Sequence, residues 1–392
     1  MSGLPVFAPA PVLLSSFSRE RRESVRPLHA RGPDFDDLYD ADTLIYDGVH
    51  DVAEGRALLL CPPFHNLAPA MRGMTLTADG RPCPFRIVPM NRHAQIRVEV
   101  PKDCAALTLD VGFGRATLPL AANKSPLFAG CRVVLTQSKN NDLVWIQDWL
   151  RFNRDINGAN GALIYDNGST DYTVEDLAAA LLAVGGLKQV AVVHWPFRFG
   201  PQGDGKGNFW DSDYCQHGVL EHARRTFLAR ADSVMNADID EFVFTTDDGS
   251  VFERVERSWI GSVRYGGRWI MGIEGHSPDA GPGVALRHKD FDTALRPQMK
   301  RKALVVSVDA LACVPKWSAV PGRCPPNSQW GIHKVHGWPV AELMTNRVTY
   351  RHFREINKGW KYRRSDRSAF DPQRHEVDEP LKALMARVDW ER

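Results

Sequence analysis

Between residues 131 and 244 the chain alternates short apolar runs with helical patterns, and this alternation restricts the fold more than any other feature. Each apolar run is short enough to be a buried strand, and each intervening segment has helical spacing or capping residues. The predicted strands are 132–136, 162–165, 189–193 and 233–237, and the predicted helices begin near residues 143, 174 and 211. Strands that alternate with helices predict parallel β-α-β units in one sheet. No internal repeat is visible.

The second predicted helix has the clearest ends. Thr173 and Asp176 form a T-x-x-D pair that predicts a capped start, and Gly185-Gly186 follows Val184 as a stop signal. The sequence therefore places this helix between two strands of the sheet.

The rest of the chain has different patterns. Residues 56–125 contain alternating segments such as Ile96, Val98 and Val100, broken by Gly, Pro and Asp-Gly, which predict a small β-sandwich of roughly six strands. This accessory domain is interpreted as a carbohydrate-binding or a packing module. Residues 1–55 lack periodicity and are expected to be an irregular leader. Residues 126–365 form the main α/β domain, and 366–392 a helical tail.

Composition excludes several classes of protein. The chain of 392 residues carries 49 basic and 47 acidic side chains, a balance that argues against nucleic acid as a partner. Its seven cysteines include no C-x-x-C pair, which favours free thiols in a reducing compartment. No apolar run is long enough to span a bilayer, and basic residues follow the first apolar stretch, unlike in a secretory signal. We expect a cytoplasmic protein with at most peripheral membrane contact. A basic stretch at 351–367, which includes Trp360 and Tyr362, would hold pyrophosphate, an anionic acceptor or a lipid surface, unless it is a solvated helix face.

An acidic cluster follows the fourth predicted strand. Asp238 and Asp240 are two residues apart and are followed by Glu241. In an open parallel sheet, ligands bind at the carboxyl ends of the strands. Carboxylate oxygens there suit Mn²⁺ or Mg²⁺, and such an ion can neutralise the charge of a departing nucleoside diphosphate. A solvated acidic turn is the structural alternative.

A second polar segment, Tyr165-Asp166-Asn167-Gly168-Ser169, ends the second predicted strand. Asp166 is suited to accept hydrogen bonds from a base or a ribose. A plain Asx turn with capping residues would give the same pattern.

Taken in order, these segments resemble a family of enzymes. Ser138-Lys139-Asn140-Asn141 with Trp149, then the Y-D-N-x-S-x-D pattern at 165–171, then the D-x-D-E-F pattern at 238–242 are similar to glycosyltransferases of the family 2 and family 92 type. The resemblance covers about residues 130–355. The family often has Asn where this chain has Glu221, and acidic residues where it has Asn141.

The resemblance implies a GT-A fold, the fold of nucleotide-diphospho-sugar transferases, and assigns roles to residues. Lys139, Asn140, Asp166, Asn167 and Asp238 would bind the donor, for which a UDP-sugar is favoured. Asp238 and Asp240 would hold Mn²⁺ or Mg²⁺. The acceptor would be a glycan or a lipid-linked glycan.

The later part of the family pattern supplies the remaining expectations. His336, or else His333, would be the third metal ligand. An inverting transfer would need a carboxylate base, for which Glu274 is chosen ahead of Asp279 and Asp290. Trp269 would offer a face to a sugar, unless it is a core residue, and His352 matches the end of the family pattern.

Two other classes of function share parts of these patterns. A metal-dependent nucleotidyltransferase would use the same acidic cluster, but the loop 137–141 contains no glycine to bind phosphates. A non-catalytic carbohydrate-binding or assembly protein would use the β-rich domain and retain the acidic cluster without activity. The donor sugar, the acceptor and the oligomeric state are open at this level.

Overall fold

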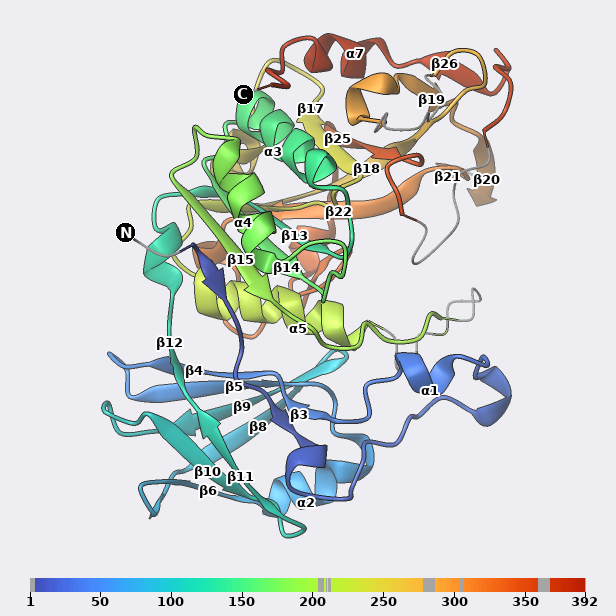
Figure 1. The fold of residues 1–392 in the computed structure, drawn as a ribbon. Helices are drawn as coiled ribbons and strands as arrows, with labels where there is room; N and C mark the ends of the chain where they lie inside the picture. The colour runs from blue at the N-terminus through green and yellow to red at the C-terminus, as the bar shows by residue number, and fades with distance from the viewer. Residues whose placement is uncertain are drawn as a thin grey trace.

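The computed structural model describes residues 4–203, 208, 210, 213–277, 286–303, 306–358 and 367–391. It contains a mixed α/β part built on one large sheet, and a smaller all-β part beside it (Figure 1).

The first half of the large sheet is parallel. Its order is β1, β15, β14, β13, β16, and every neighbouring pair in this series runs in the same direction. The bounds are β1 Val6–Phe7, β13 Arg132–Ser138, β14 Gly161–Asp166, β15 Gln189–His194 and β16 Ser233–Asn236. The four strands predicted between residues 131 and 244 are therefore confirmed, with ends shifted by one or two residues.

The second half of the sheet is mostly antiparallel. β22 pairs with β16 and β18, and β25 pairs with β17 antiparallel and with β18 parallel. The bounds are β17 Glu241–Thr245, β18 Ser262–Met271, β19 Thr293–Leu295, β22 Cys313–Ala319, β25 Met344–Phe353 and β26 His375–Val377. The chain leaves β16 and enters β17 through residues 237–240, so the acidic cluster lies at this crossing.

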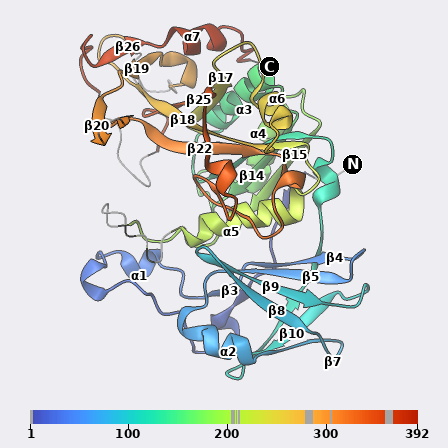
Figure 2. The ribbon, with the colours of Figure 1, turned by 180° about the vertical axis from the view of Figure 1, so that it is seen from behind.

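Helices cover both faces of the parallel half (Figures 1 and 2). α3 and α4 share a core with Val134, Ile164 and Val192, whereas α5 shares the opposite core with Val133 and Leu163. Because neighbouring strand residues are buried on opposite faces, the middle of each strand is apolar on both faces. The helix bounds are α3 Leu143–Asn157, α4 Val174–Ala183, α5 Tyr214–His222, α6 Val251–Arg257 and α7 Glu379–Met385.

Helix α4 begins with the capping pair that the sequence predicts. Thr173 Oγ1 accepts a hydrogen bond from Asp176 N at 3.1 Å, and Asp176 Oδ2 accepts one from Thr173 N at 3.0 Å. α5 is shorter than the helix predicted from residue 211, because the chain widens into a π-helical turn at Ala223–Phe227.

Two sheets form the smaller part, where the sequence predicts a β-sandwich. One has the order β12, β4, β5, β9, β8 and the other β11, β10, β6, β7. Leu59 and Ile96 of the first sheet pack with Leu76 and Leu107 of the second in one core. The bounds are β4 Asp47–Asp51, β5 Arg56–Cys61, β6 Thr75–Ala78, β7 Arg81–Pro82, β8 Phe85–Met90, β9 His93–Glu99, β10 Ala106–Asp110, β11 Arg115–Pro119 and β12 Ala121–Ala122.

The prediction of an irregular leader is wrong for much of residues 1–55. β1 adds an edge strand to the large sheet, β4 belongs to the five-stranded sheet, and β2 (Val12–Leu13) pairs with β3 (Thr43–Ile45). Strands of two or three residues are too short to show a period of two, so their partners define them. The tail contains the expected helix, α7, and also β26, which pairs with β19.

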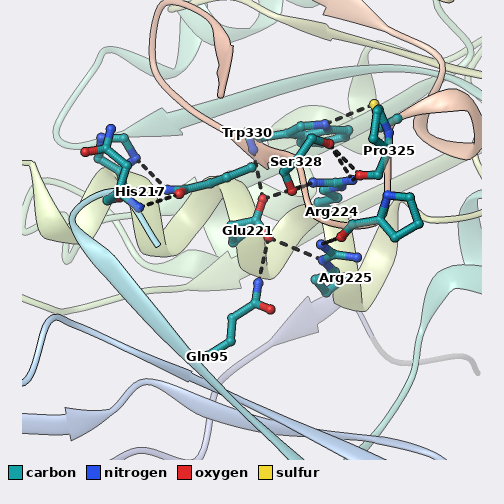
Figure 3. A network of polar contacts seen from close by, with 12 residues as sticks. Gln95, His217, Glu221, Arg224, Arg225, Pro325, Ser328 and Trp330 are labelled. Atoms are coloured by element: carbon teal, nitrogen blue, oxygen red, sulfur yellow. Dashed lines mark hydrogen bonds and ion pairs between the residues drawn. The ribbon is translucent and has the colours of Figure 1, made fainter. Parts of the chain in front are cut away.

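Helix α5 lies between the two parts and contacts both. Glu221 Oε2 accepts a hydrogen bond from Gln95 Nε2 of β9 at 3.0 Å, and Glu221 Oε1 accepts one from Trp330 N at 2.8 Å (Figure 3). His222 Nε2 lies 2.9 Å from Asp47 Oδ2 of β4. The buried helix α5 therefore contacts the outer face of the five-stranded sheet on one side and the segment around Trp330 on the other.

Among the described residues, no helix has both the length and the apolar character needed to cross a bilayer. All seven cysteines are buried and unpaired.

Candidate functional site

The carboxyl ends of β13, β14 and β16 open into one pocket. Its cavity volume is about 150 Å³, smaller than that of a site that encloses a drug-sized ligand. The pocket is lined by Gln137, Ser138, Lys139, Asn141, Asn167, Phe199, Gln216, Asp238, Ile239, Asp240, His352, Ile356 and Asn357. Four of the residues selected from the sequence, Lys139, Asn167, Asp238 and Asp240, thus line one cavity.

Asp238 is paired with a buried lysine that the sequence did not indicate. Lys316 Nζ on β22 lies 2.6 Å from Asp238 Oδ2 and 3.1 Å from Glu241 Oε2. The side chain of Lys316 is only 3% exposed, and that of Asp238 is 41% exposed. Asp238 therefore presents its carboxylate to the pocket, while Lys316 neutralises it from the protein side.

The pKa values of this group follow from the ion pairs. Burial acts to raise the pKa of Asp238, but Lys316 outweighs it and holds the pKa well below its ordinary value. Burial raises the pKa of Glu241, although Lys316 acts in the opposite direction. Burial would lower the pKa of Lys316, but Asp238 and Glu241 together raise it. Lys316 and Asp238 are thus both charged at neutral pH.

His352, rather than His336, is the histidine beside the acidic cluster. His352 Nε2 lies 3.0 Å from Asp240 Oδ2, because β25 pairs with β17 in a register that sets His352 opposite Glu241. The ring of Trp269 stacks on His352 with centroids 4.2 Å apart. Trp269 therefore supports this histidine.

His336, the first choice for a third metal ligand, does not line the pocket. His336 Nε2 lies 3.1 Å from Asn91 Nδ2, in the turn between β8 and β9, so this histidine faces the smaller part of the molecule. His333 Nδ1 donates to Pro315 O at 3.2 Å, and His333 also acts on Asp238, whose pKa is raised by burial and lowered by Lys316, His352 and His333. A short hairpin of β23 (Gln329–Trp330) and β24 (Val335–His336) directs this segment toward the junction.

Asp166 has one carboxylate oxygen engaged and one without a partner. Its side chain is buried, and Oδ2 accepts hydrogen bonds from Gly168 N and Ser169 N, each at 3.1 Å. Oδ1 is buried and has no hydrogen-bond partner in the described part of the chain. A buried acceptor without a donor is costly, so this oxygen is suited to a donor from a ligand. The next residue, Asn167, lines the pocket and donates to Trp195 O and Phe197 O.

Asn140 does not line the pocket. Its backbone is left-handed, with φ 54°, and its Oδ1 accepts from Thr170 N at 2.7 Å. This side chain ties the loop after β13 to the loop after β14.

Glu274 also lies outside the pocket. It is exposed in a turn after β18, and its backbone N donates to Ser368 O at 3.2 Å. Asp290 accepts a hydrogen bond from Arg287 N in a short helical turn. Asp279 lies outside the described residues, as do Trp360 and Tyr362. Among the described lining residues, Asp238 and Asp240 are the carboxylates.

The oxygen and nitrogen ligands around the pocket determine which kind of divalent-cation site it could form. The described residues contain no group of three His, Cys, Asp or Glu side chains that would form a complete site. Magnesium is usually held by one or two carboxylates and completed by substrate phosphates and water. The pocket therefore fits a cation that arrives with a diphosphate better than a permanently bound one.

Comparison with known proteins gives weak likenesses only. No family model matches the chain, and no curated protein matches it. Among solved structures, the mannosyltransferase Ktr4p from S. cerevisiae aligns at 10% identity and a TM-score of 0.24, over 38% of this chain and 41% of that one. The bifunctional glycosyltransferase WbbM aligns at 11% identity and a TM-score of 0.25, over 39% of this chain and 26% of that one. At these scores the likeness carries no functional weight, so function is argued from the pocket alone.

Proposed function

We propose that this chain is a glycosyltransferase of the GT-A type, which moves a sugar from a nucleoside diphosphate donor, a UDP-sugar by preference, to a glycan or lipid-linked acceptor. One observation supports it most. Asp166, with its unpartnered Oδ1, ends β14, and Asp238 and Asp240 follow β16, the two strands that flank β13. Asp238, Asp240 and Asn167, the residue after Asp166, line one pocket. Base or ribose recognition and diphosphate binding need these two kinds of group close together.

Each residue then has a role in binding. Asp166 Oδ1 accepts a hydrogen bond from the base or ribose, and Lys139 lies against the phosphates as a point charge. Asp238 and Asp240 would hold Mn²⁺ or Mg²⁺, which when bound supplies positive charge to the diphosphate as it leaves. Lys316 keeps Asp238 ionised and fixed. His352 Nε2, 3.0 Å from Asp240 Oδ2, holds that carboxylate in place.

The direct test is calorimetric titration of the protein with UDP, GDP, CDP and dTDP, with Mn²⁺ or with EDTA. We expect one nucleotide class to bind, more tightly with Mn²⁺. In Asp166→Asn the loss of a charged acceptor should weaken binding roughly tenfold or more. Asp171→Asn removes a carboxylate from the same loop outside the pocket and serves as the control.

The outcomes separate the alternatives. Unchanged affinity in Asp166→Asn would reject the assigned base or ribose contact. Asp240→Asn should remove the effect of Mn²⁺ while leaving binding in EDTA unaltered. Release of pyrophosphate from a nucleoside triphosphate would favour the nucleotidyltransferase, and glycan binding without any nucleotide binding would favour the non-catalytic protein. An inverted anomer in the product, seen by NMR, would support the inverting transfer.

A further inference from the structure

The outer face of the five-stranded sheet carries a second cavity, separate from the strand-end pocket. Its lining includes Arg86, Arg97 and Arg225, together with Asp51, Arg56 and Glu99. It lies where the smaller part meets the end of α5, because Arg225 belongs to the π-helical turn that follows this helix.

Strand register arranges these side chains in rows across one face. Asp51, Arg56 and Glu99 are directly opposite one another on β4, β5 and β9. Two residues further along, Val49, Leu58, Arg97 and Arg86 form the next row. Asp47, Leu60 and Gln95 form a third row, which α5 covers through Glu221 and His222. The first two rows therefore form the floor of the open groove.

The second row has an excess of positive charge. Arg86 and Arg97 are a directly opposed cross-strand pair, an arrangement that is destabilising for like charges. Arg97 donates only to the neutral Gln95 Oε1, at 3.2 and 3.4 Å, and within the described ranges neither arginine has a carboxylate within 4.0 Å. Burial lowers the pKa of Arg97, and the nearby Arg225 and Arg86 lower it further.

The third arginine has only a shared counter-charge. Arg225 Nε lies 3.3 Å from Glu221 Oε2, but Glu221 also neutralises Arg224 at 3.4 Å and accepts from Gln95 (Figure 3). One carboxylate thus serves two arginines beside two unpaired ones. A cluster of this kind is suited to an anion that would bridge the guanidinium groups.

The neighbouring row supplies a different chemistry. Two residues along a strand span about 7 Å, so Glu99 lies about one sugar ring away from Arg97. Asp51 is on β4, two strands across the sheet, and lies about 12 Å from Arg97. Carboxylates accept hydrogen bonds from hydroxyl groups, whereas arginines donate to an anionic substituent. A groove with arginines and carboxylates is suited to a polyhydroxylated ring that carries a negative charge. The two carboxylates would repel a purely anionic surface such as a lipid headgroup layer.

We propose that this groove binds an acidic sugar residue, whose carboxylate or phosphate lies among Arg86, Arg97 and Arg225 and whose hydroxyls face Glu99, while Asp51 lies further along the groove toward a neighbouring sugar. The site is distinct from the nucleotide pocket, and the proposal holds whether or not that pocket transfers a sugar.

The test is calorimetric titration at low ionic strength. The probes are a galacturonic acid tetrasaccharide, glucose 6-phosphate, a neutral galactose tetrasaccharide and inorganic phosphate. We expect at least one of the two anionic sugars to bind, and to bind more tightly than inorganic phosphate and the neutral tetrasaccharide. Which of the two binds shows whether the site prefers a carboxylate or a phosphate. Arg97→Gln should weaken this binding roughly tenfold or more. Arg81→Gln removes an exposed arginine from the other sheet and should have no effect.

A second readout separates binding from folding. Because Arg97→Gln relieves a like-charge pair, its unfolding temperature without ligand should equal or exceed that of the wild type. Arg86→Gln, at an exposed position of β8, gives the same binding test should Arg97→Gln fold poorly. Absence of binding to both anionic sugars, equal affinity for inorganic phosphate, or full affinity in both variants would overturn the proposal.

Discussion

At the scale of single residues, Lys316 supplies the positive charge that stabilises the acidic cluster. Asp238, Asp240 and Glu241 lie within four positions of one another, and Glu241 is only 1% exposed. Such a concentration of carboxylates would repel itself without a cation. Lys316 supplies a fixed cation within the fold, so the cluster is stable before any divalent ion binds.

This argument predicts the effect of Lys316→Met. The variant leaves Glu241 buried without its counter-charge, and we expect it to lose about 3 kcal/mol of unfolding free energy. Urea denaturation at neutral pH measures the loss. Lys334→Met is the matched control, because Lys334 pairs with Glu342 at 3.0 Å on the surface, where such pairs contribute about 0–1 kcal/mol. Equal losses in the two variants would contradict the role given to Lys316.

Only part of this site can be predicted from the sequence. Asp238, Asp240, Lys139 and Asn167 follow strands whose apolar runs are visible, so their meeting at one sheet edge could be predicted. Lys316 and His352 come from β22 and β25, and their positions depend on the register of pairing between strands far apart in the chain. The sequence favours His336, or else His333, because sequence order gives no information about which histidine is set opposite Glu241.

At the scale of elements, the parallel strands β13 to β16 can be predicted from the sequence, whereas β1 cannot. β13, β14, β15 and β16 are apolar on both faces and are flanked by capped helices, which makes them visible in the sequence. β1 has only two residues, yet Val6 and Phe7 pair with Val192 and Val193 at the edge of the sheet. A leader segment therefore protects an edge strand that would otherwise be open to solvent.

We predict that Phe7→Ala weakens this edge. The ring of Phe7 lies 5.3 Å from that of Phe227 in an edge-to-face arrangement, and Lys124 Nζ lies 5.2 Å from its centroid. Removal of the ring should cost about 2 kcal/mol of stability and speed hydrogen exchange at the backbone amides of β15. Leu4→Ala, at a position 45% exposed, should do neither. Unchanged exchange in β15 would mean that β1 is not bound stably in solution.

At the scale of the whole molecule, α5 makes the two parts one structure. Its residues reach the five-stranded sheet through Gln95 and Asp47, and they reach the segment 325–330 through Arg224, whose Nη2 donates to Pro325 O at 3.0 Å (Figure 3). Glu221 is the common acceptor in this network, and its side chain is fully buried. Burial acts to raise the pKa of Glu221, but Arg224 and Arg225 outweigh it and lower the pKa.

Glu221→Gln therefore tests whether the two parts unfold together. The amide keeps the shape of the side chain but leaves Arg224 buried without its counter-charge, so we expect a loss of about 3 kcal/mol. Because Glu221 contacts both sides, hydrogen exchange should quicken in β9 and in residues 325–330 alike. Glu253→Gln, which alters an exposed pair with Arg257 at 3.7 Å, should leave both segments protected. Faster exchange confined to α5 would show that the smaller part is held by other contacts, in which case the groove at its outer face would not depend on the helix that borders it.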